Sequence, residues 1–116
     1  MAKLSPQEVA NSLSVDRLKE LVQAMPPCDS YGYRISGFAY PPENPVVFIK
    51  NGGLDRGTDA EARMQQWAYD SLQKLPPSDR QGIHIPRIYR VVWLAEEGWI
   101  VIIMEYVPGR TLREIL

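Results

Sequence analysis

A lysine and a glutamate stand where they could hold a phosphate group between a strand and a helix. Lys50 ends the apolar run of residues 46–49, whose β-branched and aromatic side chains predict a strand. Glu61 lies in the first turn of a helix that is predicted to begin at Thr58. A lysine fixed by a strand and oriented by a nearby carboxylate can bridge nucleotide phosphates as a point charge. Taken singly, Lys50 is equally consistent with the return of the strand to solvent, and Glu61 with a capping box closed on Thr58.

A second segment of interest follows the most apolar stretch of the chain. Residues 99–104, with the sequence WIVIIM, predict a strand that is buried on both of its faces. The letters MEYV at residues 104–107 end this strand and lead into a Pro-Gly turn at 108–109. Residues 111–116 then begin a helix with its leucine and isoleucine side chains on one face. A helix this short is not stable in isolation, so that face is expected to need a covering surface.

Helix caps, helix breakers and periodicity predict the elements that would position these residues. Serine starts at Ser5 and Ser14 predict two short helices, or one bent helix, ended by the prolines at 26–27. The helix from Thr58 ends at another proline pair, 76–77. Its apolar residues recur at spacings of three and four, which predicts a single stripe for packing against the sheet. The stripe consists of Ala60, Met64, Trp67, Ala68, Leu72 and Leu75.

The remaining segments predict an antiparallel sheet. Short apolar runs separated by glycine and proline are typical of strands, and Glu96-Glu97-Gly98 predicts a tight hairpin turn between the last two. Residues 51–53 are predicted to form a loop. The order of the elements indicates the α+β class: an antiparallel sheet with one main packed helix, preceded by a short helical extension. The predicted strands cover residues 31–40, 46–49, 88–94 and 99–104.

Composition excludes several classes of protein. The chain has 116 residues, enough for one domain with a modest core, and 45% of them are hydrophobic. Its 13 basic and 14 acidic residues are scattered, so no basic stripe predicts nucleic-acid binding. A single cysteine and a single histidine leave no internal disulfide and no zinc cluster. Because no signal peptide or membrane-spanning run is apparent, we expect a soluble cytoplasmic protein that binds neither nucleic acid nor membrane.

In their order and spacing, these segments resemble the amino-terminal lobe of the protein kinases and of the aminoglycoside and choline phosphotransferases. The resemblance is carried by the strand VVFIK, the helix with Glu61, and the hairpin and hinge IPRIYRVVW–GWIVIIMEYVPGRTL. It covers residues 32–116. On this basis the chain divides into a helical extension at 1–27, a kinase-like lobe at 28–107, and a hinge with the start of a second lobe at 108–116.

The resemblance implies a role in ATP binding for five residues. Lys50 would contact the α- and β-phosphates, and Glu61 would orient it. Met104 would stand beside the adenine ring as the gatekeeper, although plain core packing explains this residue equally well. The backbone carbonyl of Glu105 and the backbone N–H of Val107 would pair with the adenine edge. Those two contacts depend on position and not on side-chain identity.

The sequence departs from the family pattern in the parts that carry the chemistry. No glycine-rich phosphate loop precedes VVFIK. The family's aspartate base, asparagine and magnesium-binding aspartate belong to a second lobe that has no counterpart in residues 1–116. Phosphoryl transfer depends on positioning and on metal-assisted charge stabilisation. We therefore expect no catalytic residue in this chain, and Mg²⁺ binding only if a second lobe is supplied.

Three functions stay open on the sequence. The chain is a partial phosphotransferase that acts within a longer protein, a non-catalytic module that docks a partner through the exposed hinge face, or an inactive remnant. The uncovered lobe face around Lys50, Met104 and residues 112–116 is expected to favour a homo-oligomer or a partner protein. The sequence does not indicate the phosphate acceptor, because in this fold the acceptor is chosen by the second lobe.

Overall fold

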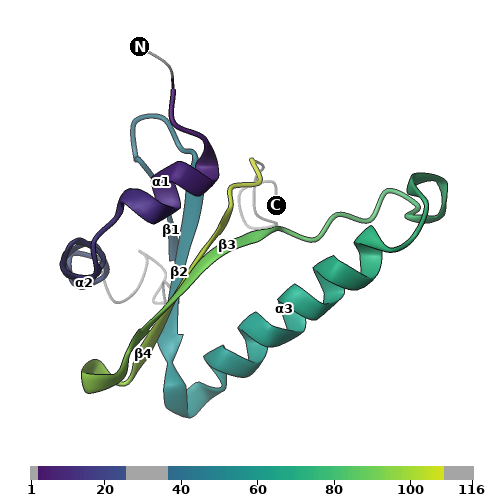
Figure 1. Cartoon of the computed structure of the whole chain (residues 1–116). Coiled ribbons are helices and arrows are strands. Elements are labelled where there is room, and N and C mark those ends of the chain that lie inside the picture. The colour runs from purple at the N-terminus through teal and green to yellow at the C-terminus, as the bar shows by residue number, and fades with distance from the viewer. Residues whose placement is uncertain (1–2, 26–36, 109–116) are drawn as a thin grey trace, which may run out of the picture.

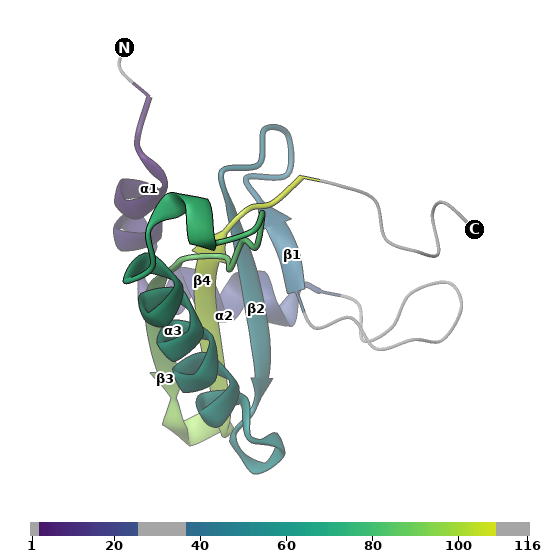
Figure 2. The same cartoon turned by 90° about the vertical axis from the view of Figure 1, so that its right-hand side faces the viewer.

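One antiparallel sheet with helices on both faces makes up the fold (Figures 1 and 2). The computed structural model describes residues 3–25 and 37–108. The strands are β1 (Gly37–Tyr40), β2 (Val47–Gly53), β3 (Ile88–Leu94) and β4 (Trp99–Glu105), and the α-helices are α1 (Pro6–Ser12), α2 (Val15–Gln23) and α3 (Thr58–Gln73). The strands follow the order β1-β2-β4-β3, with α1 and α2 on one face and α3 on the other. The predicted α+β class and antiparallel sheet are confirmed.

The centre of the sheet is β4, as its composition predicted. Its residues 100–104 are buried, and it pairs with β2 on one side and β3 on the other. An interior strand covered on both faces contributes every side chain to a core, so an unbroken apolar run suits it better than an alternating one. The connection from β3 is a 3-10 turn, Ala95–Glu97, followed by Gly98 at a φ of 70°. That left-handed backbone favours glycine, and the predicted hairpin turn is confirmed.

The strand that carries Lys50 is longer than the sequence indicated. Residues 51–53, predicted to form a loop, continue β2 and pair with residues 99–101 of β4. Glycine disfavours a strand in isolation, but the long apolar partner supplies backbone hydrogen bonds along the whole of β2. Gly52 lies so close to the side chain of Thr58 that a Cβ at this position would collide with it. The loop prediction is wrong because these glycines serve a close approach of strand to helix and not a turn.

The amino-terminal helices begin where their serines predicted. Ser5 and Glu8 form a capping box: Oγ of Ser5 accepts from the N–H of Glu8 (3.2 Å), and the Glu8 carboxylate accepts from the N–H of Ser5 (3.0 Å). Ser14 caps α2 by accepting from the N–H of Arg17 (3.0 Å). Both helices bury apolar side chains in one cluster with β2, β3 and β4. The described part of the predicted extension, residues 1–27, therefore shares its core with the sheet.

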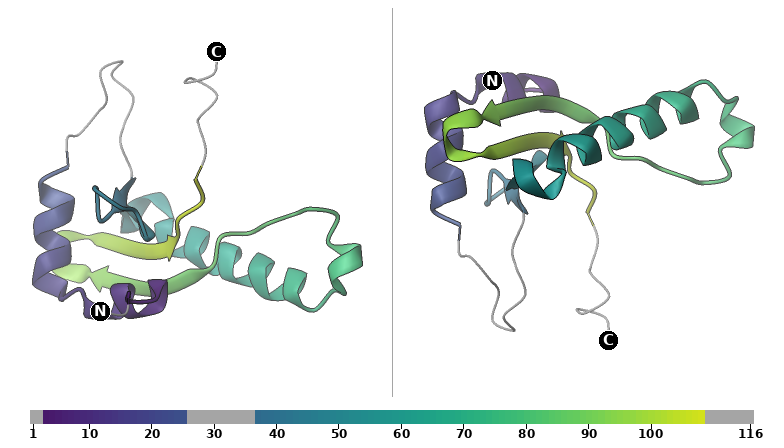
Figure 3. Two further views of the ribbon diagram at one scale, coloured as in Figure 1. Left: turned by 90° about the horizontal axis from the view of Figure 1, so that it is seen from above. Right: turned by 90° about the horizontal axis from the view of Figure 1, so that it is seen from below.

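α3 packs on the sheet with a different face from the one predicted. Thr58 and Ala62 are the buried residues of this helix. Met64 and Trp67, which were expected to pack, are 64% and 66% exposed, and Leu75 just beyond the helix is 44% exposed. The carboxyl-terminal half of α3 projects past the sheet (Figure 3), which leaves little sheet surface to cover the stripe. Periodicity identifies residues that share a face but not the surface which that face meets, so the predicted packing is wrong.

Two predicted segments lie outside the described residues. These are the first part of the strand predicted at 31–40 and the turn and helix predicted at 109–116. The described end of the first segment is a strand, β1. Within residues 3–25 and 37–108, no helix combines the length and the apolar character that crossing a membrane requires.

Candidate functional site

The structure brings Lys50 and Glu61 together. Lys50 lies in β2 opposite Ile102 of β4, and its ammonium forms an ion pair with the Glu61 carboxylate in the first turn of α3. The N-cap of α3 is Gly57, without a side-chain cap, so the alternative of a capping box between Thr58 and Glu61 is wrong. The Lys50 side chain is 29% exposed and that of Glu61 51% exposed. A ligand in solvent can therefore reach both charged groups.

Met104 lies on the face of the sheet that carries this ion pair. It is opposite Phe48 in the β2–β4 register, two positions from the pair formed by Lys50 and Ile102. Because side chains alternate along a strand, all four project toward α3. Met104 is 8% exposed, and Nε2 of Gln65 on α3 approaches its sulfur at 3.8 Å. Core packing of Met104 is thus confirmed.

Glu105 ends β4 and forms hydrogen bonds with the segment that leads into β3. Its backbone N–H donates to the carbonyl of Arg87 (2.7 Å), and its carboxylate accepts from the N–H of Arg87 (3.2 Å). The same carboxylate lies 2.7 Å from Nε2 of His84. Val107 follows β4 and is 51% exposed. No sequence pattern predicts the contact with His84, because it joins residues from two separate segments.

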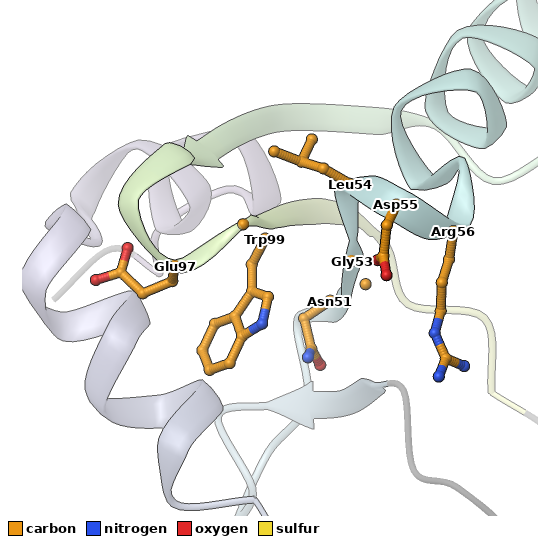
Figure 4. A pocket seen from close by; sticks show the side chains of 9 residues that line it. Asn51, Gly53, Leu54, Asp55, Arg56, Glu97 and Trp99 are labelled. Atoms are coloured by element: carbon orange, nitrogen blue, oxygen red, sulfur yellow. The ribbon is translucent and has the colours of Figure 1, made fainter.

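A cavity lies away from these residues, at the ends of β2 and β4 that adjoin turns (Figure 4). Its volume is about 510 Å³, and Trp99, Asn51 and the two adjoining turns line it. Oδ1 of Asn51 and Oε2 of Glu97 are buried without a hydrogen-bond partner. Asn51 follows Lys50 along β2, so the two side chains point to opposite faces of the sheet. None of the five predicted site residues lines this cavity. Sequence reasoning missed it because its lining comes from strand ends and turns, which form no sequence motif.

A second lysine–glutamate pair provides a reference for the first. Nζ of Lys19 on α2 lies 3.0 Å from Oε1 of Glu97 in the hairpin turn. Glu97 raises the pKa of Lys19 through a hydrogen bond and through its charge. The Lys19 side chain is 29% exposed, the same fraction as for Lys50, but it lies on the α2 side of the sheet. The two lysines are therefore equally exposed but lie on opposite faces of the sheet.

Neither a metal site in the described residues nor a known relative indicates the function of this chain. Among the residues that the structure describes, no group of three or more His, Cys, Asp or Glu side chains could hold a metal ion. Comparison with protein-family models, curated proteins and solved structures finds no match for this chain.

Proposed function

We propose that this chain is the nucleotide-binding lobe of a kinase-like phosphotransferase. The observation that carries the proposal is the ion pair between Lys50 and Glu61, which links the strand and helix that the family resemblance pairs. Met104 shares their face of the sheet, and Glu105 and Val107 follow at the end of the adjacent strand. Four of the five residues proposed to bind ATP thus lie on two neighbouring strands and on α3, and Val107 follows the second strand.

In the proposed complex, the Lys50 ammonium lies between the Glu61 carboxylate and the ATP phosphates. An ammonium has three N–H donors, and one carboxylate oxygen occupies only one of them. A partly exposed Lys–Glu pair contributes no more than about 1 kcal/mol to stability, so the fold does not depend on keeping it closed. The pair can therefore orient the lysine and still leave donors for an incoming anion.

The adenine would lie against the edge of Met104 near the end of β4. Its polar edge would pair with the backbone carbonyl of Glu105 and the backbone N–H of Val107. The Glu105 side chain is held by Arg87 and His84, which fixes the direction of the backbone at this point. A rigid backbone edge can recognise a flat heterocycle without any specific side chain.

We assign nucleotide binding, and not catalysis, to the residues described. Phosphoryl transfer needs a base for the acceptor and metal ions that neutralise the developing charge. A second lobe would supply that base, the Mg²⁺ ligands and the acceptor pocket. The class of acceptor is therefore not part of the proposal.

Calorimetric titration with ATP tests the proposal, with two lysine variants compared. We expect the unmodified chain to bind ATP with a Kd of about 1 mM or tighter. Lys50→Ala should weaken binding about 10- to 100-fold, since a charge-assisted hydrogen bond is worth about 1.5–3 kcal/mol. Lys19→Ala is the matched control, because it removes an equally exposed lysine from a lysine–glutamate pair on the other face of the sheet.

Two results would contradict the nucleotide site. One is equal loss of affinity in both variants, which would indicate nonspecific attraction of ATP to positive charge. The other is no binding by a chain whose circular dichroism shows it folded. In that case the resemblance is architectural only, and a non-catalytic module that docks a partner through the hinge face becomes the better interpretation.

A further inference from the structure

Two residues that line the cavity of Figure 4 carry buried oxygens without a hydrogen-bond partner in the described part of the chain. They are Oδ1 of Asn51 and Oε2 of Glu97. Buried polar atoms that stay unpaired are rare in folded proteins, and each one calls for a functional or structural explanation. Both atoms are hydrogen-bond acceptors, so a ligand that satisfies them has to supply O–H or N–H donors.

Trp99 gives the cavity an aromatic wall between these two residues. Its indole packs against the buried cluster on the α1 and α2 face, which limits its movement. Figure 4 shows the indole with Glu97 on one side and Asn51 on the other. Gly53 lies opposite Trp99 in the strand register, and the Asp55 carboxylate occupies the place that a Cβ at Gly53 would take. The cavity thus combines a flat apolar surface with a few polar groups, as small-molecule sites commonly do.

The charges around the cavity are balanced. Nζ of Lys19 pairs with Oε1 of Glu97 (3.0 Å), and Asp55 is followed by Arg56 in the turn after β2. A ligand ammonium at Oε2 of Glu97 would lie beside the Lys19 ammonium, whereas a ligand anion would face the carboxylates of Asp55 and Glu97. A hydroxyl group meets neither repulsion, and it can both donate and accept. The surroundings therefore favour a neutral ligand that is rich in hydroxyl groups.

We propose that this cavity binds a small neutral polyol of about the size of a monosaccharide. Two of its hydroxyl groups donate to Oδ1 of Asn51 and Oε2 of Glu97, and the apolar C–H face of its ring lies on the Trp99 indole. A hydroxyl that donates to a carboxylate forms a short, charge-assisted hydrogen bond. The hydroxyl groups that remain can accept from the Arg56 guanidinium at the same cavity.

The dimensions and the position of the cavity suit this ligand. Its volume of about 510 Å³ lies within the range of about 300–1,000 Å³ that is usual for small-molecule sites. The terminal torsions of asparagine and glutamate side chains are soft, so small rotations can direct both oxygens at a ligand. Asn51 and Lys50 project to opposite faces of the sheet. The inference is therefore independent of the proposed nucleotide site.

An NMR titration of the indole N–H signals tests the site. The chain has three tryptophans, and Trp67 and Trp93 are exposed and do not line the cavity, so they serve as internal controls. Trp67→Phe and Trp93→Phe assign the signals. We expect D-glucose or myo-inositol to shift the Trp99 signal alone, with a Kd of about 10 mM or tighter. If neither polyol produces a saturable shift of the Trp99 signal, the proposal is wrong.

A series of charged analogues distinguishes a neutral polyol from an ionic ligand. D-glucosamine carries an ammonium in place of one hydroxyl group, and D-glucuronate carries a carboxylate in place of the hydroxymethyl group. We expect both to bind about fivefold or more weakly than D-glucose, because each brings a charge close to a like charge at the cavity. Tighter binding of either analogue than of D-glucose would contradict a site for a neutral ligand.

Two adjacent glutamates provide a matched pair of variants. Glu97→Gln removes the carboxylate at the cavity, and Glu96→Gln makes the same change one residue earlier, where the side chain does not line the cavity. We expect Glu97→Gln to weaken D-glucose binding about tenfold and Glu96→Gln to leave it unchanged. Equal affinities of the two variants would rule out recognition by Glu97.

Asn51→Leu separates a role in binding from a role in folding. Leucine has a similar volume but no hydrogen-bonding atom, so this variant should also weaken D-glucose binding. Its thermal midpoint should be equal to or higher than that of the unmodified chain, because the substitution removes a buried oxygen without a partner. A lower midpoint with unchanged D-glucose affinity would show that Asn51 supports the fold and not the ligand.

Discussion

The two faces of the sheet differ in how completely they are packed. On the face covered by α1 and α2, eleven described residues form the buried cluster. On the face covered by α3, the buried cluster has four. The lysine that is proposed to meet a nucleotide lies on the second face, beside a helix that leaves large apolar side chains exposed. One face thus provides most of the core, and the other provides accessible chemical groups.

The two lysine–glutamate ion pairs of the described residues also lie on different faces of the sheet. Lys19 with Glu97 connects α2 to the hairpin turn, whereas Lys50 with Glu61 connects β2 to α3. Neither pair contributes much to stability on general grounds. Their surroundings distinguish them, because only Lys50 lies beside residues for which we propose a nucleotide role. A lysine–glutamate ion pair is therefore not specific by itself, and the pair of Lys50 with Glu61 carries the functional proposal because it joins the strand and the helix that the family resemblance pairs.

The largest expected effect comes from truncating adjacent isoleucines of β4 that project to opposite faces. Ile103 is 0% exposed in the larger cluster and Ile102 is 1% exposed in the smaller one. We expect Ile103→Ala to lower the free energy of unfolding by about 4 kcal/mol and Ile102→Ala by about 3 kcal/mol, within the range for buried truncations. The difference arises because the sparser face can relax around the cavity. Urea denaturation measures both, and a larger loss for Ile102→Ala would reverse the comparison.

Arg90 is expected to produce the next largest effect, on the more tightly packed face. Its guanidinium donates to the carbonyls of Ala10 (3.0 Å) and Leu13 (2.6 Å) at the end of α1. Arg90→Ala leaves both carbonyls without this donor and should destabilise the chain by about 2–3 kcal/mol. Arg90→Lys should retain part of this, because the ammonium keeps N–H donors but cannot take the position of Nη1, which makes both contacts. Thermal unfolding of the three proteins provides the test, and equal midpoints would show that α1 is not held by Arg90.

The smallest expected effect is a dependence on pH at the start of α1. The backbone N–H and hydroxyl of Ser5 lower the pKa of Glu8 from its ordinary value of 4.5. A lowered folded-state pKa stabilises the fold above the ordinary value, and this contribution is lost as pH falls through the folded value. Glu8→Gln, which lacks the titrating group, should therefore show a weaker loss of stability below pH 4.5. Parallel pH curves for the two proteins would contradict the assignment.

Asp59 offers the corresponding test on the α3 face. Arg63 and the backbone N–H of Ala60 lower its pKa. The sign is the same as for Glu8, so this contribution to stability is also lost in acid. NMR can follow the titration of the Asp59 carboxyl directly. A normal pKa for Asp59 would show that its contact with Arg63 is not maintained.

Local patterns account for the parts of the fold that were predicted correctly. The capping box of Ser5 and Glu8 depends on residues three apart, and the turn at Gly98 on a single backbone conformation. The unbroken apolar run of β4 predicts burial on both faces, because a strand with one face in solvent would alternate apolar and polar residues. The relation of Lys50 to Glu61 followed from the order of strand and helix. The sequence could place both residues but could not show that their side chains meet.

Contacts between distant segments account for the rest, and only the tertiary structure decided them. The extension of β2 through its glycines depends on the length of β4 and on the approach of Gly52 to Thr58. The contact of His84 with Glu105 depends on how the chain returns from α3. The face that α3 turns to the sheet depends on what lies nearby, since the same stripe could be covered by the sheet or by another chain. By itself, the sequence determined which residues are apolar and how they repeat, because those properties are local. Which surface each apolar face packs against depends on the positions of all the other elements. Only the tertiary structure could therefore decide it.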